Sequence, residues 1–125
     1  MSLLKKKEGA LGEDYACRFL TKKGFRVIER NYRLRNGEID IIAIDNSEKE
    51  KVLVFIEVKT RKSTQFGTPL EAIGYHKLKA LTNAVQVYKI SHKGLPDQLR
   101  LDAIAITLDE SNKITNIEHI KNISS

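Results

Sequence analysis

Hydrophobic and polar positions alternate through much of this chain, a pattern typical of half-buried β-strands. In "KVLVFIEVKT", Val52, Val54 and Ile56 share one face, and the residues between them share the other. Asn36-Gly37 separates two such runs and is a strong signal for a hairpin turn. We predict five strands, at residues 25–34, 38–45, 51–60, 100–108 and 114–120.

Two other stretches have the 3.6-residue period of amphipathic helices. The first spans residues 4–23 and stops at Gly24. The second begins at about residue 76, after Thr68-Pro69-Leu70-Glu71, which has the form of a capping box. Their apolar positions are Leu11, Tyr15, Ala16, Phe19 and Leu20 in the first stretch and Ile73, Leu81, Ala84, Val85 and Tyr88 in the second.

The predicted elements follow the order α-β-β-β-α-β with a trailing strand. A helix between the third and fourth strands permits a parallel crossover, whereas short turns join antiparallel neighbours. We therefore expect an α/β fold in which a mixed sheet, beginning with a three-stranded meander, is flanked by helices. The length of 125 residues suits one domain, residues 1–125.

Composition and charge narrow the class of protein. No apolar run approaches the ~18 residues of a membrane span, and the N-terminal stretch lacks a secretory pattern. The single cysteine, Cys17, cannot form an internal disulfide, so we expect a cytoplasmic protein. The formal charge is +6, and basic residues cluster in "RNYRLRNG" and "KTRK". This surplus favours a nucleic acid partner over a membrane surface.

Acidic residues inside apolar strands are costly unless they are paired or bind a metal. Asp40 lies in "GEIDIIAI", and Glu57 lies in "VFIEVK" with Lys59 on the same strand face. In a simple hairpin, Asp40 and Glu57 meet only with an offset or a bend. Two carboxylates suit Mg²⁺ or Mn²⁺, and a lysine beside them can act on a water. These are the parts needed for metal-assisted phosphodiester hydrolysis.

The spacing of Asp40, Glu57, Val58 and Lys59 resembles the D…(D/E)xK signature of the restriction-endonuclease-like nucleases. The surrounding segments, in order, resemble the YraN-type family of small bacterial endonuclease-like proteins over roughly residues 8–120. These segments are "GEDYACRFLTKKGFRVIERNYRLRNGEIDIIAID", "VFIEVKTRK", "FGTPLEAI", "KLKALTNA" and "RLDAIAI". The chain is similar, more distantly, to archaeal Holliday junction resolvases.

The resemblance implies a restriction-endonuclease-like core and a role for each matching residue. Asp40, Glu57 and the main-chain carbonyl of Val58 would bind Mg²⁺ or Mn²⁺, and Lys59 would act on the water. Glu13, in the first helix, matches an acidic residue that resolvase-like nucleases place near the metal. Candidate contacts to nucleic acid are Arg33, Arg35, Arg61, Lys62 and Lys77.

Each of these residues also has a structural explanation. Glu57 and Lys59 could be an ion pair on an edge strand, and Asp40 could cap a turn. Glu38 could support Arg33 or Arg35, or join the site. Further structural assignments are an internal pair between Arg100 and Asp102, a core position for Cys17, and surface positions for His76, His92 and His119.

Three functional hypotheses follow. The first is a Mg²⁺-dependent endonuclease acting on DNA, particularly structured or branched DNA, for which a homodimer would be suitable. The second is a nucleic-acid-binding module that keeps the fold but has no catalysis. The third is an interaction protein whose carboxylates serve an interface with a partner protein. The retained pair of carboxylates and the lysine favour the first.

Overall fold

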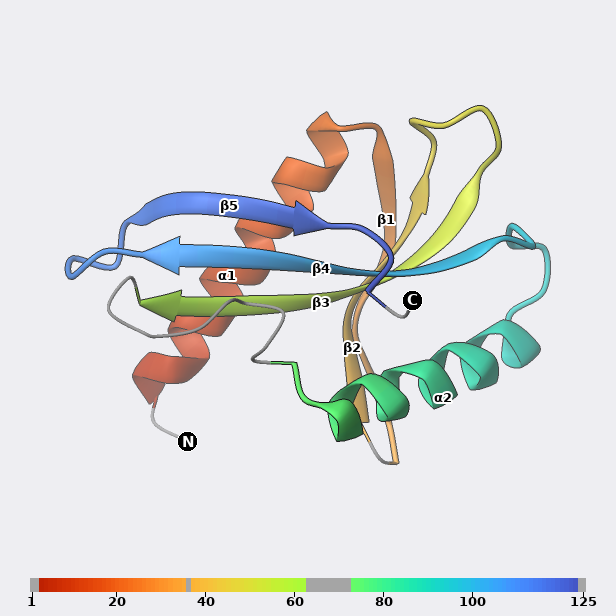
Figure 1. The fold of residues 1–125 in the computed structure, drawn as a ribbon, viewed down its shortest axis with the longest axis horizontal. Helices are drawn as coiled ribbons and strands as arrows, with labels where there is room; N and C mark the ends of the chain where they lie inside the picture. The colour runs from red at the N-terminus through yellow and green to blue at the C-terminus, as the bar shows by residue number, and fades with distance from the viewer. Residues whose placement is uncertain (1–2, 36, 63–72, 124–125) are drawn as a thin grey trace.

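The computed structural model describes residues 3–35, 37–62 and 73–123. The elements are, in chain order, α1 (Leu3–Lys22), β1 (Phe25–Leu34), β2 (Gly37–Asp45), β3 (Val52–Lys62), α2 (Tyr75–Ser91), β4 (Leu99–Leu108) and β5 (Ile114–Ile120) (Figure 1). This order confirms the predicted α/β fold, and every predicted strand is present within two residues of its expected bounds. The predicted capping box at residues 68–71 lies outside the described residues.

The five strands form one sheet in the order β1-β2-β3-β4-β5. The first three strands pair antiparallel as the predicted meander. β3 and β4 pair parallel, because α2 carries the chain back across the sheet between them. β5 returns antiparallel to β4. The arrangement is a mixed sheet compatible with a nuclease-like fold.

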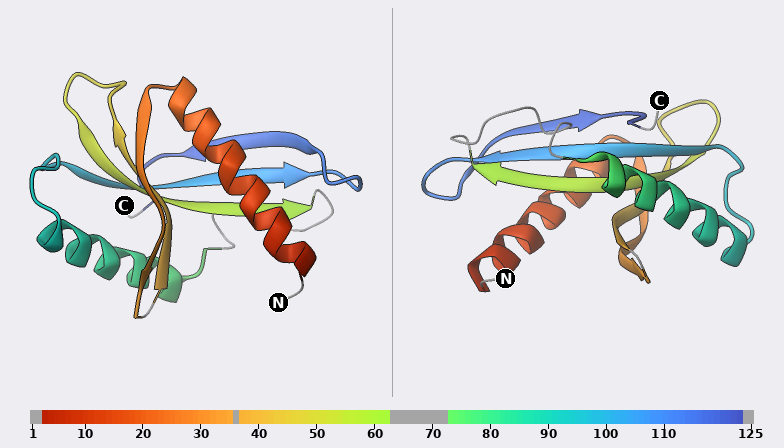
Figure 2. Two further views of the ribbon diagram at one scale, coloured as in Figure 1. Left: turned by 180° about the vertical axis from the view of Figure 1, so that it is seen from behind. Right: turned by 60° about the horizontal axis from the view of Figure 1, so that its bottom comes forward.

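The two helices cover opposite faces of the sheet (Figures 1 and 2). Ala16 and Leu20 of α1 pack on a cluster that includes Val54 and Ile56 of β3. α2 packs on the other face, where it contacts the side of β3 that carries Phe55. The alternation along β3 therefore supplies apolar side chains to both layers, as the sequence predicts.

The first helix is less amphipathic than its sequence suggested. Leu11 and Tyr15, which were predicted to lie in the core, are 43% and 42% exposed. Ala16 and Leu20 are fully buried, so α1 contacts the core through these residues and not through Leu11 and Tyr15. Gly24 ends the helix as predicted, with a left-handed φ of +94° that favours glycine.

β2 changes its orientation at Asp40. Ile39 packs in the cluster beneath α2, whereas Ile41, two residues later, packs in the cluster beneath α1. Residues two apart share a face in a regular strand, so the strand must bend or rotate between them. The pairing of β2 with β3 also ends here, at Ile41 and Ile56. Beyond this point β3 continues alongside β4, and the β1–β2 hairpin turns away (Figure 1).

Among the described residues, no helix is both long enough and apolar enough to cross a membrane.

Candidate functional site

The divergence of β2 and β3 brings Asp40 and Glu57 together. The last ladder pair joins Ile41 to Ile56, so the next position along each strand is Asp40 and Glu57. No offset in the register is needed, but the bend is present. The carboxylate of Asp40 takes the place of a strand partner, because its Oδ2 accepts a 2.8 Å hydrogen bond from the amide of Val58.

The two carboxyl groups perturb each other. Burial, followed by repulsion from Asp40, raises the pKa of Glu57 to about 8. Burial also raises the pKa of Asp40, although the hydrogen bond from Val58 opposes this shift. A hydrogen bond between the two groups lowers the pKa of Asp40 and raises that of Glu57, which is the behaviour of a pair that shares a proton.

Glu57 carries a polar atom that the fold does not satisfy. The residue is only 8% exposed, and its Oε2 is buried without a hydrogen-bond partner. A buried, unpaired carboxylate oxygen is costly and is rare in native structures. The fold therefore leaves a strong acceptor position open beside Asp40.

Two lysines supply positive charge to this pair. Lys77 of α2 places its Nζ 3.7 Å from Glu57 Oε1, which is an ion pair but too long for a good hydrogen bond. Lys59 lies two residues beyond Glu57 on β3, is half-buried, and also lowers the pKa of Glu57. The predicted grouping of Asp40, Glu57 and Lys59 is thus present, and Lys77 joins it from the second helix.

Glu13 approaches the same pair from α1. Its pKa is raised to about 7 by burial and then by repulsion from Asp40, so the helix places a third carboxylate within electrostatic range. The close packing of α1 on β3 depends on Gly12. A Cβ at that position would meet Thr60 Oγ1 at 2.3 Å, well inside van der Waals contact. Gly12 therefore lets the helix lie close enough to β3 to bring Glu13 to the site.

Asn31 is a residue that the sequence reasoning missed. It lies in β1 with a left-handed φ of 53°. Two carboxylates face this side-chain amide, so the amide is assigned the orientation in which its nitrogen and not its oxygen points toward them. In this orientation the nitrogen donates to Glu13 Oε1 at 2.7 Å and to Glu38 Oε1 at 2.8 Å. The available signal was an asparagine in the middle of a predicted strand, since asparagine tolerates left-handed φ better than most residues. Glu38 joins the acidic group through this amide and also lies 3.8 Å from Arg33.

The donor set is suitable for a hard divalent cation. Within residues 3–35, 37–62 and 73–123, no group of three or more His, Cys, Asp or Glu side chains is arranged to hold a metal ion. Asp40 and Glu57 are instead a two-carboxylate set with one open oxygen. Mg²⁺ commonly binds through one or two carboxylates and keeps several waters. The residues therefore fit Mg²⁺ or Mn²⁺, with Val58 offering a main-chain carbonyl and Glu13 lying outside direct coordination.

Besides Lys77, the predicted contacts to nucleic acid lie on β1, in the turn that follows it, and at the end of β3. Arg33 is exposed on β1, and Arg35 is exposed in the turn that follows. Arg61 and Lys62 continue β3 beyond Lys59 and are half-buried. Their role in binding nucleic acid stays a prediction.

A second group of buried charges joins Asp45, at the other end of the β2–β3 ladder, to Arg100 and Asp102 of β4, which are in register with Val54 and Ile56 of β3. Arg100 donates through Nε to Asp102 Oδ1 at 2.8 Å and through Nη2 to Asp45 Oδ2 at 2.9 Å. This confirms the predicted Arg100–Asp102 pair and adds Asp45, which the sequence reasoning missed. The prediction for His119 was wrong. Its side chain is 3% exposed and lies 2.8 Å from Asp102, with Lys23 2.9 Å from its other nitrogen.

His92 is half-buried instead of fully exposed, because its ring stacks on Tyr88 at 3.9 Å. Cys17 is partly buried against the α1-side core, so the predicted core position is only partly correct. The side chain of His76 lies outside the described residues.

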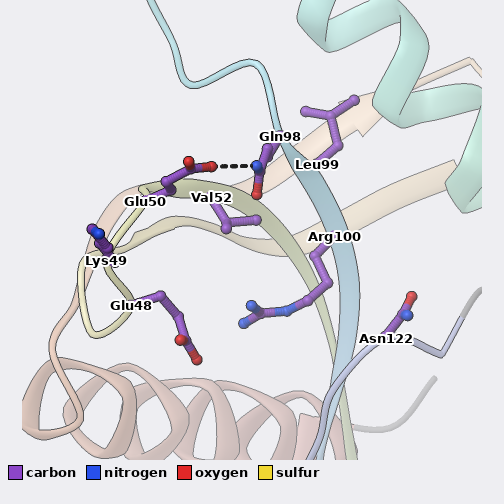
Figure 3. A pocket seen from close by; sticks show the side chains of 8 residues that line it. All are labelled: Glu48, Lys49, Glu50, Val52, Gln98, Leu99, Arg100 and Asn122. Atoms are coloured by element: carbon purple, nitrogen blue, oxygen red, sulfur yellow. Dashed lines mark hydrogen bonds between the residues drawn. The ribbon is translucent and has the colours of Figure 1, made fainter.

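A cavity of about 430 Å³ lies beside the second charged group (Figure 3). It is lined by Glu48, Glu50, Gln98 and Arg100 among others, and Glu50 accepts a 2.6 Å hydrogen bond from Gln98 across its rim. The guanidinium of Arg100 is already bound to Asp45 and Asp102, so the cavity offers no open charged group from this side chain. None of the residues of the acidic site lines it.

Comparison with known proteins places the chain among bacterial relatives. The pattern of Uncharacterised protein family UPF0102 matches residues 12–106. A UPF0102 protein of Alkaliphilus oremlandii is 45% identical over 121 residues, which are 95% of this chain and 98% of the relative. UPF0102 proteins of Dictyoglomus thermophilum and Dictyoglomus turgidum are 40% and 37% identical, each over 117 residues, 94% of this chain and 96% of the relative.

The matched residues 12–106 include the acidic site, α2 and the part of α1 from Gly12 onward, and the alignment with the Alkaliphilus relative covers nearly all of both chains. The predicted membership of a family of small bacterial proteins is therefore confirmed, and this protein belongs to Uncharacterised protein family UPF0102.

Proposed function

We propose that this protein is a divalent-metal-dependent endonuclease that hydrolyses phosphodiester bonds in DNA, with structured or branched DNA as its preferred substrate. One observation carries the proposal. Glu57 Oε2 is buried without a partner beside a second carboxylate whose pKa is also raised. A fold that keeps this arrangement in its sheet accepts a stability cost, and a bound cation removes that cost.

The roles follow from position and charge. Asp40 and Glu57 would hold Mg²⁺ or Mn²⁺, which when bound would polarise the scissile phosphate and help a water to ionise. Lys59, on the same strand face as Glu57, would orient that water and neutralise charge that develops on the phosphate. Glu13, with a pKa of about 7, is suited to exchange a proton near neutral pH. The formal charge of +6 would attract the DNA backbone.

The first test is calorimetric titration of Mg²⁺ and Mn²⁺ into the wild type, Asp40→Asn and Asp97→Asn. Asp97 is fully exposed, so its substitution removes the same charge without touching the site. We expect binding in the wild type and Asp97→Asn and none in Asp40→Asn. Equal binding in all three proteins would refute the assignment of Asp40.

The second test measures cleavage on the same preparations, with single-stranded, linear duplex and four-way branched DNA. Lys59→Met should keep metal affinity and lose roughly 10²-fold or more in cleavage rate, because only the lysine that acts on the water is removed. Lys93→Met, at an exposed position, is the matched control. Salt-dependent DNA binding without turnover in any divalent metal would instead favour a binding module.

A further inference from the structure

Asn31 lies opposite the bend in β2. Its neighbours in β1 pair in register, Arg30 with Ile41 and Tyr32 with Ile39, so Asn31 faces Asp40 across the ladder. Its φ of 53° is left-handed, a conformation in which most L-residues are strained and asparagine is tolerated. The residue of β1 with left-handed φ, Asn31, therefore lies opposite the residue at which β2 bends, Asp40.

This coincidence has a consequence for Asp40. The bend separates Ile39 and Ile41 onto opposite faces of the sheet, and it leaves Asp40 free to accept the hydrogen bond from Val58. A regular β1 would continue the flat ladder past this point. We therefore infer that the left-handed backbone of Asn31 accommodates the bend that turns Asp40 toward Val58 of β3.

The side chain of Asn31 joins three elements. Its amide nitrogen contacts Glu13 of α1 and Glu38 of β2 from its own place in β1. Both contacts are charge-assisted when the carboxylates are ionised. Asn31 is exposed, and Glu13 and Glu38 repel each other and Asp40, so these bonds hold groups that would otherwise separate.

We propose that Asn31 is a positioning residue of the acidic site, whose left-handed backbone directs Asp40 toward Val58 and whose amide holds Glu13 beside Asp40. The backbone role does not require catalysis. The role of the amide in cleavage rests on the proposed function, so the experiment separates the two.

Three variants separate the backbone from the side chain. Asn31→Gly keeps access to left-handed φ and removes the amide, whereas Asn31→Ala removes both. Asn31→Asp keeps tolerance of left-handed φ and replaces the donor with a repelling carboxylate. Asn112 has a φ of 62° in the turn between β4 and β5, where its Oδ1 accepts a hydrogen bond from Lys62. Asn112→Ala and Asn112→Gly are therefore matched controls for the exchange of the Val58 amide and not for DNA cleavage.

The first measurement is amide hydrogen exchange at Val58 by NMR, in the protein without metal or DNA. We expect Asn31→Ala to speed exchange of the Val58 amide about tenfold or more, because Asp40 no longer protects it. Asn31→Gly and both Asn112 variants should leave that rate within about threefold of the wild type. Unchanged protection of Val58 in Asn31→Ala would overturn the backbone role, as would an equal loss in Asn112→Ala.

The second measurement is Mn²⁺ affinity and the cleavage rate. We expect Asn31→Ala to weaken Mn²⁺ binding at least tenfold. Asn31→Gly should bind Mn²⁺ within about threefold of the wild type and lose at least tenfold in kcat, with Asn31→Asp at least as impaired. Wild-type rates in Asn31→Gly would overturn the role of the amide. A wild type that neither binds Mn²⁺ nor cuts DNA would refute the proposed function and the amide's role, and the Val58 exchange would still decide the backbone role.

Discussion

The sheet carries two groups of buried acidic side chains, and the fold treats them in opposite ways. At Asp45 and Asp102, burial would raise the pKa of each carboxyl, but hydrogen bonds outweigh it and hold both pKa values below their usual range. At Asp40 and Glu57 both pKa values are raised. In the first group, one half-buried arginine donates hydrogen bonds to both carboxylates. In the second group, two half-buried lysines, Lys59 and Lys77, lie near the pair, and one oxygen of Glu57 has no partner.

The group of Asp45, Arg100 and Asp102 therefore stabilises the fold, whereas the pair of Asp40 and Glu57 keeps an oxygen atom open for a ligand. The carboxylate of Asp102 accepts hydrogen bonds from three partners, which are Arg100, His119 and the amide of Asn122. A completed set of partners leaves no place for a ligand, whereas an incomplete one is destabilising until something binds. The comparison therefore gives separate predictions for stability and for binding.

The largest expected effect is at the completed group. Arg100→Met should lower the free energy of unfolding by about 3–5 kcal/mol, because it leaves Asp45 and Asp102 buried without their cation. Urea denaturation at pH 7 measures this, with the exposed Arg26→Met as control. A loss below about 1 kcal/mol would show that water or a shifted Lys23 replaces the guanidinium, and the contrast between the two groups would fail.

The next effect is at the incomplete group and has the opposite sign. The folded pKa of Glu57, about 8, lies above its ordinary 4.5, so its proton is bound more tightly in the folded state. The contribution of Glu57 to stability is then full below about pH 4.5 and is lost as pH rises toward 8. Glu57→Gln should remove that slope and raise the free energy of unfolding by about 2–4 kcal/mol at pH 8.

The measurement is urea denaturation of wild type and Glu57→Gln from pH 4.5 to 9 in the presence of a chelator. Parallel curves for the two proteins would contradict the raised pKa. Below pH 4 both proteins should lose stability together, since the lowered pKa values of Asp45 and Asp102 mean that their contribution disappears as these groups take up protons.

A bound divalent cation should supply the missing partner of Asp40 and Glu57, so that this pair, like the Arg100 group, stabilises the fold. At a Mn²⁺ concentration of about 100 times its Kd, the wild type should gain about 2.7 kcal/mol of stability. The gain should be larger at pH 8 than at pH 6, because binding requires the pair to ionise. Thermal unfolding with and without Mn²⁺ measures it. Asp40→Asn should show no gain and Asp97→Asn the full gain, and a gain in Asp40→Asn would place the cation elsewhere.

The smallest effect concerns the packing that brings Glu13 to the site. Gly12→Ala should destabilise the protein by about 1 kcal/mol, because the clash of its Cβ with Thr60 exceeds the gain in helix propensity. In a Thr60→Ala background the same substitution should become stabilising, since the clashing oxygen is gone. A double-mutant cycle by urea denaturation measures the coupling, and equal effects in both backgrounds would exclude the close contact.

The sequence predicted the architecture well because hydrophobic periodicity is a local signal. Alternation along β3 defined both of its faces, Gly24 lies just beyond the end of α1, and Gly37 begins β2. It also predicted that Asp40, Glu57 and Lys59 belong together, since charges within apolar strands are conspicuous.

The features that the sequence did not predict depend on contacts between elements that are far apart in the chain. Asp45 looked like an ordinary residue at the end of a strand, and it is buried because Arg100 comes from β4, 55 residues later. His119 looked exposed because its partners, Lys23 and Asp102, lie on other elements. The left-handed φ of Asn31 leaves no trace in hydrophobic periodicity. Leu11 and Tyr15 had the right spacing for a core position, but the face of α1 that contacts the sheet is the one that carries Gly12, Ala16 and Leu20.

The topology also gives the two groups contacts of different sequence separation. Asp40 and Val58, like Asn31 and Glu38, lie within one meander, and their contacts close short loops of 18 residues or fewer. Arg100 meets Asp45 only after the parallel crossover through α2, which closes a much longer loop. Short loops close first, so we expect the acidic site to take shape in the folding nucleus and the charged network to form after the main barrier. In stopped-flow experiments, Arg100→Met would then speed unfolding and leave the refolding rate nearly unchanged.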